Sequence, residues 1–157
     1  MTTIQQVAAS ERDVLWRYLQ FYIYEMSQFT GARPIDGVFT YGRFDAYWGN
    51  EERWAFWAQQ AGDKAGFALV RLDASDGRRE IAEFFIVNRW RRRGVGSAFA
   101  RLLFSRFPGL WKLHQLADNT TAIAFWHRVL DGFVAYTEAP LAYADGLRRI
   151  EQRFVVG

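Results

Sequence analysis

The sequence predicts a mixed α+β fold, with a central, mostly antiparallel sheet, one parallel β-α-β unit and helices on both faces. Three observations lead to this prediction. The chain starts with a helical pattern, continues with short strand-like runs separated by turn signals, and ends with alternating strands and helices. Residues 80–116 form a strand–helix–strand unit, whose strands we expect to be parallel and joined by a right-handed crossover. Half of the 157 residues are hydrophobic, which is enough for one core, so we expect a single domain over residues 1–157.

The first expected element is a helix over residues 11–29. Its apolar side chains recur at helical spacing, Ser10 is placed to cap its N-terminus, and Gly31 and Pro34 follow its end. Residues 32–50 are rich in Gly, Tyr and Phe and show little periodicity, so they predict a long loop with a short turn or strand near its end.

The rest of the chain predicts strands that are joined first by hairpin turns and later by helices. Gly62-Asp63-Lys64 suits one hairpin turn, and Asp76-Gly77 suits the next. Glycine and proline mark the ends of the two later helices. The expected strands cover residues 53–60, 65–72, 79–87, 111–116, 133–137 and 148–156, and the expected helices cover residues 94–107 and 119–130.

Cysteine and histidine usage excludes several classes of site. The chain has no cysteine, so disulfides, a thiol nucleophile and cysteine-ligated metals are excluded. The two histidines, His114 and His127, do not have a metal-ligand spacing, and we therefore expect no catalytic metal. The first residues lack the features of a signal peptide, and there is no uninterrupted apolar run of about 18 residues. We expect a cytoplasmic protein with no membrane partner.

The basic residues indicate a polyanionic ligand. The net charge is +3, and all but two of the 20 basic residues are arginine, which binds phosphate bidentately. Such a ligand could be nucleic acid or a phosphorylated cofactor. The densest cluster, residues 89–93, is one short turn, and the other arginines are scattered among acidic residues. We therefore expect no nucleic-acid partner.

The residues that follow position 83 predict a phosphate site. An apolar strand leads through a basic loop into a helix that opens with Gly94 and Gly96. The first turn of a helix exposes unpaired N–H groups and carries partial positive charge, and glycine lets a ligand approach the backbone. Taken alone, the glycine pair could also be a tight strand-to-helix turn. It is neither a dinucleotide fingerprint nor a P-loop, because a third glycine and a Gly-Lys-Ser/Thr run are both missing.

Three short motifs lie between residues 80 and 135. They are the strand Glu83-Phe84-Phe85-Ile86, the turn Arg91-x-x-Gly94-x-Gly96, and Asn119-x-x-Ala122-x-x-Phe125-Trp126 followed by Gly132-Phe133. In this order and spacing they resemble the motifs of the GNAT superfamily of N-acetyltransferases. The resemblance implies the fold of that family, with acetyl-CoA as the cosubstrate.

The resemblance also implies which residues bind the coenzyme. In that family the amides of the glycine turn bind the pyrophosphate, and the fourth and fifth strands splay so that the pantetheine arm pairs with the fourth. Asn119 is expected to contact the arm, and Phe125 and Trp126 to lie near it; helix capping for Asn119 and core packing for Phe125 are the alternatives. The residues implied for the turn are Arg91, Arg92, Arg93, Gly94, Val95, Gly96 and Ser97, and those implied for the strand are Phe84, Phe85 and Ile86.

Glu83 matches the position at which this family often has a catalytic carboxylate. An amine is mostly protonated at neutral pH, so a base must remove a proton before the amine attacks the thioester. The alternative role for Glu83 is an ion pair with a nearby arginine. Glu80, three residues earlier in an extended strand, is expected to point to the opposite face. Trp126 departs from the family's usual tyrosine, and because an indole does not titrate usefully, no general acid is assigned.

The implied function is transfer of an acetyl or other acyl group from acetyl-CoA to a primary amine by direct attack. A non-catalytic acyl-CoA-binding sensor or interaction module is the alternative. The acceptor, a small-molecule amine or a peptide, is expected beside residues 22–25, 33–48 and 136–145, where aromatic side chains suggest a walled pocket. The C-terminal strand could mediate a homodimer.

Overall fold

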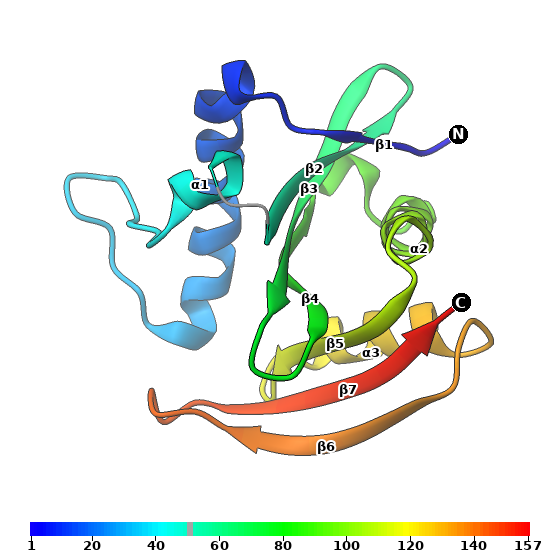
Figure 1. Ribbon diagram of the computed structural model, residues 1–157. Helices are drawn as coiled ribbons and strands as arrows, with labels where there is room; N and C mark the ends of the chain where they lie inside the picture. Colours follow the sequence, from blue (N-terminus) through cyan, green and yellow to red (C-terminus); the bar gives the residue numbers. More distant parts are fainter. Residues whose placement is uncertain (50–51) are drawn as a thin grey trace.

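The computed structural model describes residues 1–49 and 52–157 and contains one seven-stranded sheet (Figure 1). The strand order is β1-β2-β3-β4-β5-β7-β6. Neighbouring strands pair antiparallel, except that β4 and β5 are parallel and are joined through α2, which confirms the predicted fold class. The strands are β1 (Thr3–Gln6), β2 (Arg53–Gln60), β3 (Asp63–Asp73), β4 (Arg78–Ile86), β5 (Gly109–Leu116), β6 (Tyr136–Ala142) and β7 (Arg148–Val156). The helices are α1 (Arg12–Thr30), α2 (Val95–Arg106) and α3 (Thr120–Leu130), with short 3-10 turns η1 (Ala9–Glu11), η2 (Phe44–Trp48) and η3 (Asn88–Trp90).

Helices cover both faces of the sheet, as predicted. Figure 1 shows α1 and the loop after it on one side of β2–β4, and α2 and α3 on the other. Each face therefore has its own apolar core, and the central strands are apolar on both sides. The largest buried side chains include Leu15, Leu19, Trp57 and Phe67 in the α1 core, and Phe56, Phe99, Leu103 and Trp111 in the core under α2 and α3.

Several element boundaries follow from local chemistry that the sequence displays. β2 and β7 have the predicted bounds. α1 ends at Gly31, which has a φ of 72° and donates its N–H to the carbonyl of Ser27, as expected for a left-handed helix cap. Among the described residues, no helix is long and apolar enough to cross a membrane.

Two predictions near the N-terminus are wrong. Ser10 does not cap α1, because η1 precedes the helix and makes Glu11 the N-cap, without a side-chain capping bond. β1 was not predicted at all. It has four residues, most of them exposed and polar, and it pairs with β2 at the edge of the sheet. Such a strand lacks the apolar alternation on which a sequence prediction depends.

Two turn predictions are also displaced. The first hairpin turns at Ala61 and Gly62, which both have positive φ, so Asp63 and Lys64 already belong to β3. The strand predicted at residues 133–137 begins only at Tyr136. Its first residues instead donate backbone hydrogen bonds to the carbonyl of Leu130 and close the end of α3.

β4 and β5 diverge along most of their length. Among the described residues, they pair only at Arg79 with Trp111 and at Glu80 with Lys112. By contrast, β5 pairs with β7 along its whole length, from Gly109 to Leu116. The strands therefore open into a V beyond Glu80, and this V lies between the two halves of the sheet.

A bulge in β4 changes the direction of its side chains. Leu69 of β3 pairs with Glu83 and Val70 pairs with Ile81, so Ala82 is the extra residue of a β-bulge. Glu80 pairs with Arg71, which lies two residues from Leu69 and therefore on the same face. Glu80 and Glu83 consequently share the α1 face. The prediction that Glu80 points to the opposite face is wrong, because it assumed regular alternation.

Candidate functional site

The connection from β4 to α2 forms a turn with its backbone open to ligands. Arg92 and Gly94 have φ values of 60° and 79°, in the left-handed region. Gly94 is the N-cap of α2, and a Cβ added there would meet nothing within 4 Å. The amides of the first helical turn have no acceptor within the helix. This geometry fits an anionic phosphate in front of Gly94 and the start of α2.

Gly96 has a different role from Gly94. It is buried, and a Cβ at this position would lie 3.0 Å from Cε1 and 3.1 Å from Cζ of Phe125. Contacts this short require the phenyl ring to move. The second glycine of the motif therefore allows α2 and α3 to pack closely.

Replacing Gly96 by valine is expected to lower the free energy of unfolding by about 2 kcal/mol, because the side chain overpacks the contact with Phe125. Denaturant unfolding of the parent and the variant measures the difference. Gly96→Ala serves as the graded control and is expected to cost less, since alanine also favours the helix. A valine variant as stable as the parent would contradict this role of Gly96.

Phe84, Phe125 and Trp126 form one aromatic cluster on the α2 and α3 side of the sheet. The ring centroids of Phe84 and Trp126 are 4.9 Å apart, as are those of Phe125 and Trp126. Trp126 is only 7% exposed. Phe125 is partly buried and packs against the core, in agreement with one of its two predicted roles. Trp126 belongs to the same aromatic cluster.

Asn119 lies where the chain leaves β5 and enters α3. Its Oδ1 accepts a hydrogen bond from the backbone N–H of Ala122 at 3.2 Å. Asn119 therefore caps α3, which was one of its two predicted roles. Its Nδ2 lies 3.8 Å from Sδ of Met26 in α1, to which it donates. The side chain therefore connects α1 to the β5 arm of the V.

The three arginines of the loop differ in their surroundings. Arg91 is held by Glu25 of α1, as described below. Arg92 and Arg93 are exposed, and the guanidinium of Arg93 lies 5.7 Å from the centre of the Trp90 ring. The side chains of Arg92 and Arg93 are therefore the ones placed to meet a phosphate from solvent.

Glu83 is partly buried on the α1 face, and its carboxyl lies beside the hydroxyl of Tyr22. Burial, together with the nearby charge of Glu80, raises the pKa of the Glu83 carboxyl to about 8. Among the described residues, Glu83 has no ion pair with an arginine; that ion pair belongs to buried Glu80 and Arg71. Glu83 therefore has the perturbed pKa typical of a catalytic carboxyl.

Two tyrosines of the long loop enclose this carboxyl. Tyr47 is buried, Tyr41 is partly buried, and burial raises the pKa of both phenols. The charge of Glu83 contributes to both shifts, which places the carboxyl close to them. The loop thus forms an aromatic cover over the bulge in β4.

His114 belongs to the site, although the sequence did not indicate it. It lies in β5, two residues beyond the last pair with β4, and its Nδ1 is 3.7 Å from Oε2 of Glu80. Its ring contacts the ring of Tyr143 edge-on, with 5.9 Å between centroids. Burial lowers its pKa, which favours the neutral imidazole. Its position in the strand, beside the predicted V, was the available signal.

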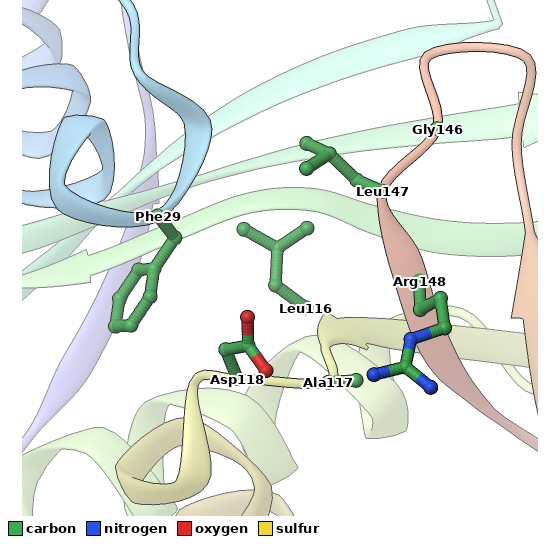
Figure 2. Close-up of a pocket in the computed structure, with 7 residues that line it drawn as sticks. All are labelled: Phe29, Leu116, Ala117, Asp118, Gly146, Leu147 and Arg148. Atoms are coloured by element: carbon green, nitrogen blue, oxygen red, sulfur yellow. The ribbon is translucent and has the colours of Figure 1, made fainter.

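Two cavities adjoin the V. A cleft of about 720 Å³ lies between the second half of α1 and the end of β4, and its lining includes Phe21, Glu25, Phe85 and Arg91. A smaller pocket of about 130 Å³ lies at the end of β5. Figure 2 shows Phe29, Leu116 and Leu147 around this pocket, with Asp118 and Arg148 at its border.

Comparisons with known proteins agree with this geometry. The acetyltransferase (GNAT) family model matches residues 18–131. Among solved structures, the ribosomal-protein-S18-alanine N-acetyltransferase from Escherichia coli superposes with a TM-score of 0.67 at 17% identity, over 100% of this chain and 95% of that one. The aminoglycoside acetyltransferase AAC(6')-Ib in complex with coenzyme A gives 0.69 at 15% identity, over 97% and 94%.

A third solved structure is a spermidine N-acetyltransferase variant from Vibrio cholerae, with a TM-score of 0.68 at 11% identity, over 98% of this chain and 94% of that one. No curated protein sequence matches the chain significantly. At these identities the solved structures show the fold, while the family model covers well over half of the chain. The chain therefore belongs to the GNAT family of acetyltransferases and is an acetyl-CoA-dependent N-acetyltransferase.

Proposed function

We propose that the V between β4 and β5 holds the coenzyme and that the α1 face of the bulge in β4 holds the amine. The observation that carries this proposal is the divergence of the two strands directly beyond Glu80, next to the left-handed turn at Gly94. The amides of residues 92–97 bind the pyrophosphate. On the side of β4 that faces β5, the backbone of Phe84, Phe85 and Ile86 binds the pantetheine arm as an added strand, and Asn119 contacts this arm from the end of β5.

The coenzyme supplies an acyl thioester, whose carbonyl carbon is attacked by the amine nitrogen while the carbon–sulfur bond breaks. Within the chain, Glu83 takes the proton that the amine loses. The Tyr22 side chain lies beside the Glu83 carboxyl and limits its exposure to solvent. Trp126 donates no proton to the departing thiolate, whose own pKa of about 8.5 lets solvent protonate it.

The acceptor that fits this face is a small molecule or peptide with a primary ammonium group. Glu80 and Glu83 supply carboxyl groups, and Tyr41, Tyr143 and His114 supply aromatic walls. Aromatic faces favour cations, and Glu83 accepts the proton that the ammonium group must lose. The three enzymes whose structures are named above are, by their names, acetyltransferases of an alanine of a ribosomal protein, of an aminoglycoside and of spermidine. All three of these acceptors present amines.

Calorimetric titration with acetyl-CoA tests the coenzyme site, with CoA and ATP as comparison ligands. We expect micromolar binding of acetyl-CoA and CoA and much weaker binding of ATP, which lacks the pantetheine arm. A panel of amines, with release of free thiol as the readout, then identifies the acceptor. A well-folded protein that does not bind acetyl-CoA would contradict the proposed site.

A further inference from the structure

The loop between β4 and α2, residues 87–94, is here called the coenzyme loop. Its ion pair with α1, between Arg91 and Glu25, extends the proposed function. We propose that Glu25 is a positioning residue for the coenzyme, which fixes Arg91 and thereby the left-handed turn whose amides bind the pyrophosphate. The inference rests on the proposed placement of the pyrophosphate at residues 92–97. It assigns a role to a residue of α1 that lies outside the three motifs of the family resemblance.

The guanidinium of Arg91 is fixed from two sides. Its Nη1 and Nη2 donate to Oε1 and Oε2 of Glu25 at 2.7 and 2.8 Å, which is a bidentate pair. Its Nε donates to the carbonyl of Ile86 at 2.6 Å. The guanidinium also lies 5.4 Å from the centre of the Phe85 ring. With these contacts Arg91 is oriented toward α1 and the end of β4, and it acts as an anchor for the loop.

The turn that follows needs such an anchor. Arg92 adopts a φ of 60°, and this left-handed conformation costs a residue with a Cβ about 1 kcal/mol or more. Arg91 immediately precedes it, and its N–H donates to the carbonyl of Asn88 at 3.2 Å. Fixing Arg91 at both its backbone and its side chain therefore holds the strained turn in the geometry that presents Gly94 and the α2 amides.

Glu25 is part of a row of α1 side chains that meet the site. Glu25 and Met26 follow Tyr22 by three and four residues, so both lie on the same side of the helix as Tyr22. Contacts from this row reach the β4 arm, the coenzyme loop and the β5 arm, which means that one helix sets the positions of all three. The contacts are Tyr22 with Glu83, Glu25 with Arg91, and Met26 with Asn119.

A purely structural role explains the pair less well. α1 is already fixed to the sheet by the fully buried Leu15 and Leu19. The side chains of Arg91 and Glu25 are 35% and 39% exposed, and ion pairs with that exposure add little to stability. Removing the ion pair is therefore expected to alter the conformation of the coenzyme loop more than the free energy of unfolding.

Glu25→Gln tests the proposal, with binding of CoA measured by calorimetry and steady-state kinetics measured against acetyl-CoA. The expected result is a roughly tenfold increase in Kd for CoA and in KM for acetyl-CoA, with kcat at saturation within about twofold of the parent. Removing a negative charge near an anion would by itself tighten binding, so weaker binding identifies loss of the anchor. Arg91→Lys keeps the positive charge but loses the bidentate geometry, and it is expected to weaken binding similarly.

Glu11→Gln is the matched control. Glu11, the N-cap of α1, forms an ion pair with Lys64 at 3.0 Å with similar exposure, and this pair does not involve Arg91, so its loss is expected to leave Kd unchanged. Equal CoA affinity of the Glu25→Gln variant and the parent would overturn the Glu25 proposal alone. Tighter binding would also overturn it, because Glu25 would then compete with the pyrophosphate for Arg91. A parent protein that binds no CoA would overturn the coenzyme site and the Glu25 proposal together.

Discussion

Glu83→Gln is expected to lower kcat/KM for the amine by at least about a hundredfold, since loss of a positioned general base costs that order of rate. The amide keeps the size of the carboxyl and its contact with Tyr22, but it cannot take a proton. Thiol release at saturating acetyl-CoA measures the effect. Calorimetry with CoA is the control, because the proposed coenzyme contacts of β4 are made by its main chain, so the affinity should not change. A variant with parental kcat/KM would exclude Glu83 as the base.

The pH profile distinguishes loss of a base from a packing defect. Because the Glu83 pKa is raised to about 8, only a minor fraction of the carboxyl is ionised at pH 7. The parental rate is therefore expected to rise between about pH 7 and 9, with its midpoint near 8, and then to level off. In the Gln variant this step should disappear. A step of the same size in both proteins would assign it to another group, such as the amine itself.

The same substitution is expected to stabilise the fold at high pH. The native pKa of Glu83 lies above its ordinary value of 4.5, so between pH 4.5 and 8 the native state keeps a proton that the unfolded chain has lost. The parent therefore loses stability as pH rises through this range, by at most about 1.4 kcal/mol per pH unit. Glutamine removes this loss. Denaturant unfolding at pH 5.5 and 8.5 should show a gain that grows with pH.

Gly94→Glu is expected to abolish coenzyme binding, with at least a hundredfold increase in Kd for CoA. The glutamate would project a side chain and a negative charge into the open space where the pyrophosphate must lie. It would also occupy a backbone conformation, with φ of 79°, that disfavours any side chain. Calorimetry with CoA measures the change.

Gly77→Glu is the matched control for that substitution. Gly77 also has a positive φ, 70°, and open space around its Cβ position, but it lies at the other end of β4. It therefore carries the same strain and charge without reaching the coenzyme loop. Gly94→Ala separates the two causes further, because it keeps the strain without the charge and should weaken binding only severalfold. Equal CoA affinity in both glutamate variants would contradict a pyrophosphate site at Gly94.

The coenzyme loop was the most predictable part of the site. Its geometry depends on neighbours in the chain, since an apolar strand, a polar turn and a glycine at the helix start together determine the path of the backbone. Gly94 accordingly lies at the start of α2, where the sequence places it, and Asn119 caps α3, which was one of its two predicted roles. The sequence could not show that Gly96 serves the contact with Phe125, because that contact joins two helices.

The acceptor side was less predictable, since it depends on irregular and long-range features. The bulge at Ala82 brings Glu80 and Glu83 to one face, and no local pattern of residues marks it. His114 became a site residue only through the register of β4 against β5. The partners Glu25 and Arg91 are 66 positions apart in the chain, and an acid and an arginine at such a distance have many alternative partners in a sequence alone.

The divergence of β4 and β5 gives the molecule two edges in the middle of its sheet. Beyond Glu80 the facing edges of the two strands do not pair with each other, a condition that proteins usually confine to the rim of a sheet and protect there. Without the coenzyme, the half-sheets β1–β4 and β5–β7 are joined by two backbone residue pairs and by the ion pairs of Lys112 with Asp73 and Asp76, and α2 and α3 share an apolar core with strands of both halves. A coenzyme bound in the V supplies the missing ladder, so it is both a substrate and a structural part, and at a hundred times its Kd it would stabilise the fold by about 2.7 kcal/mol.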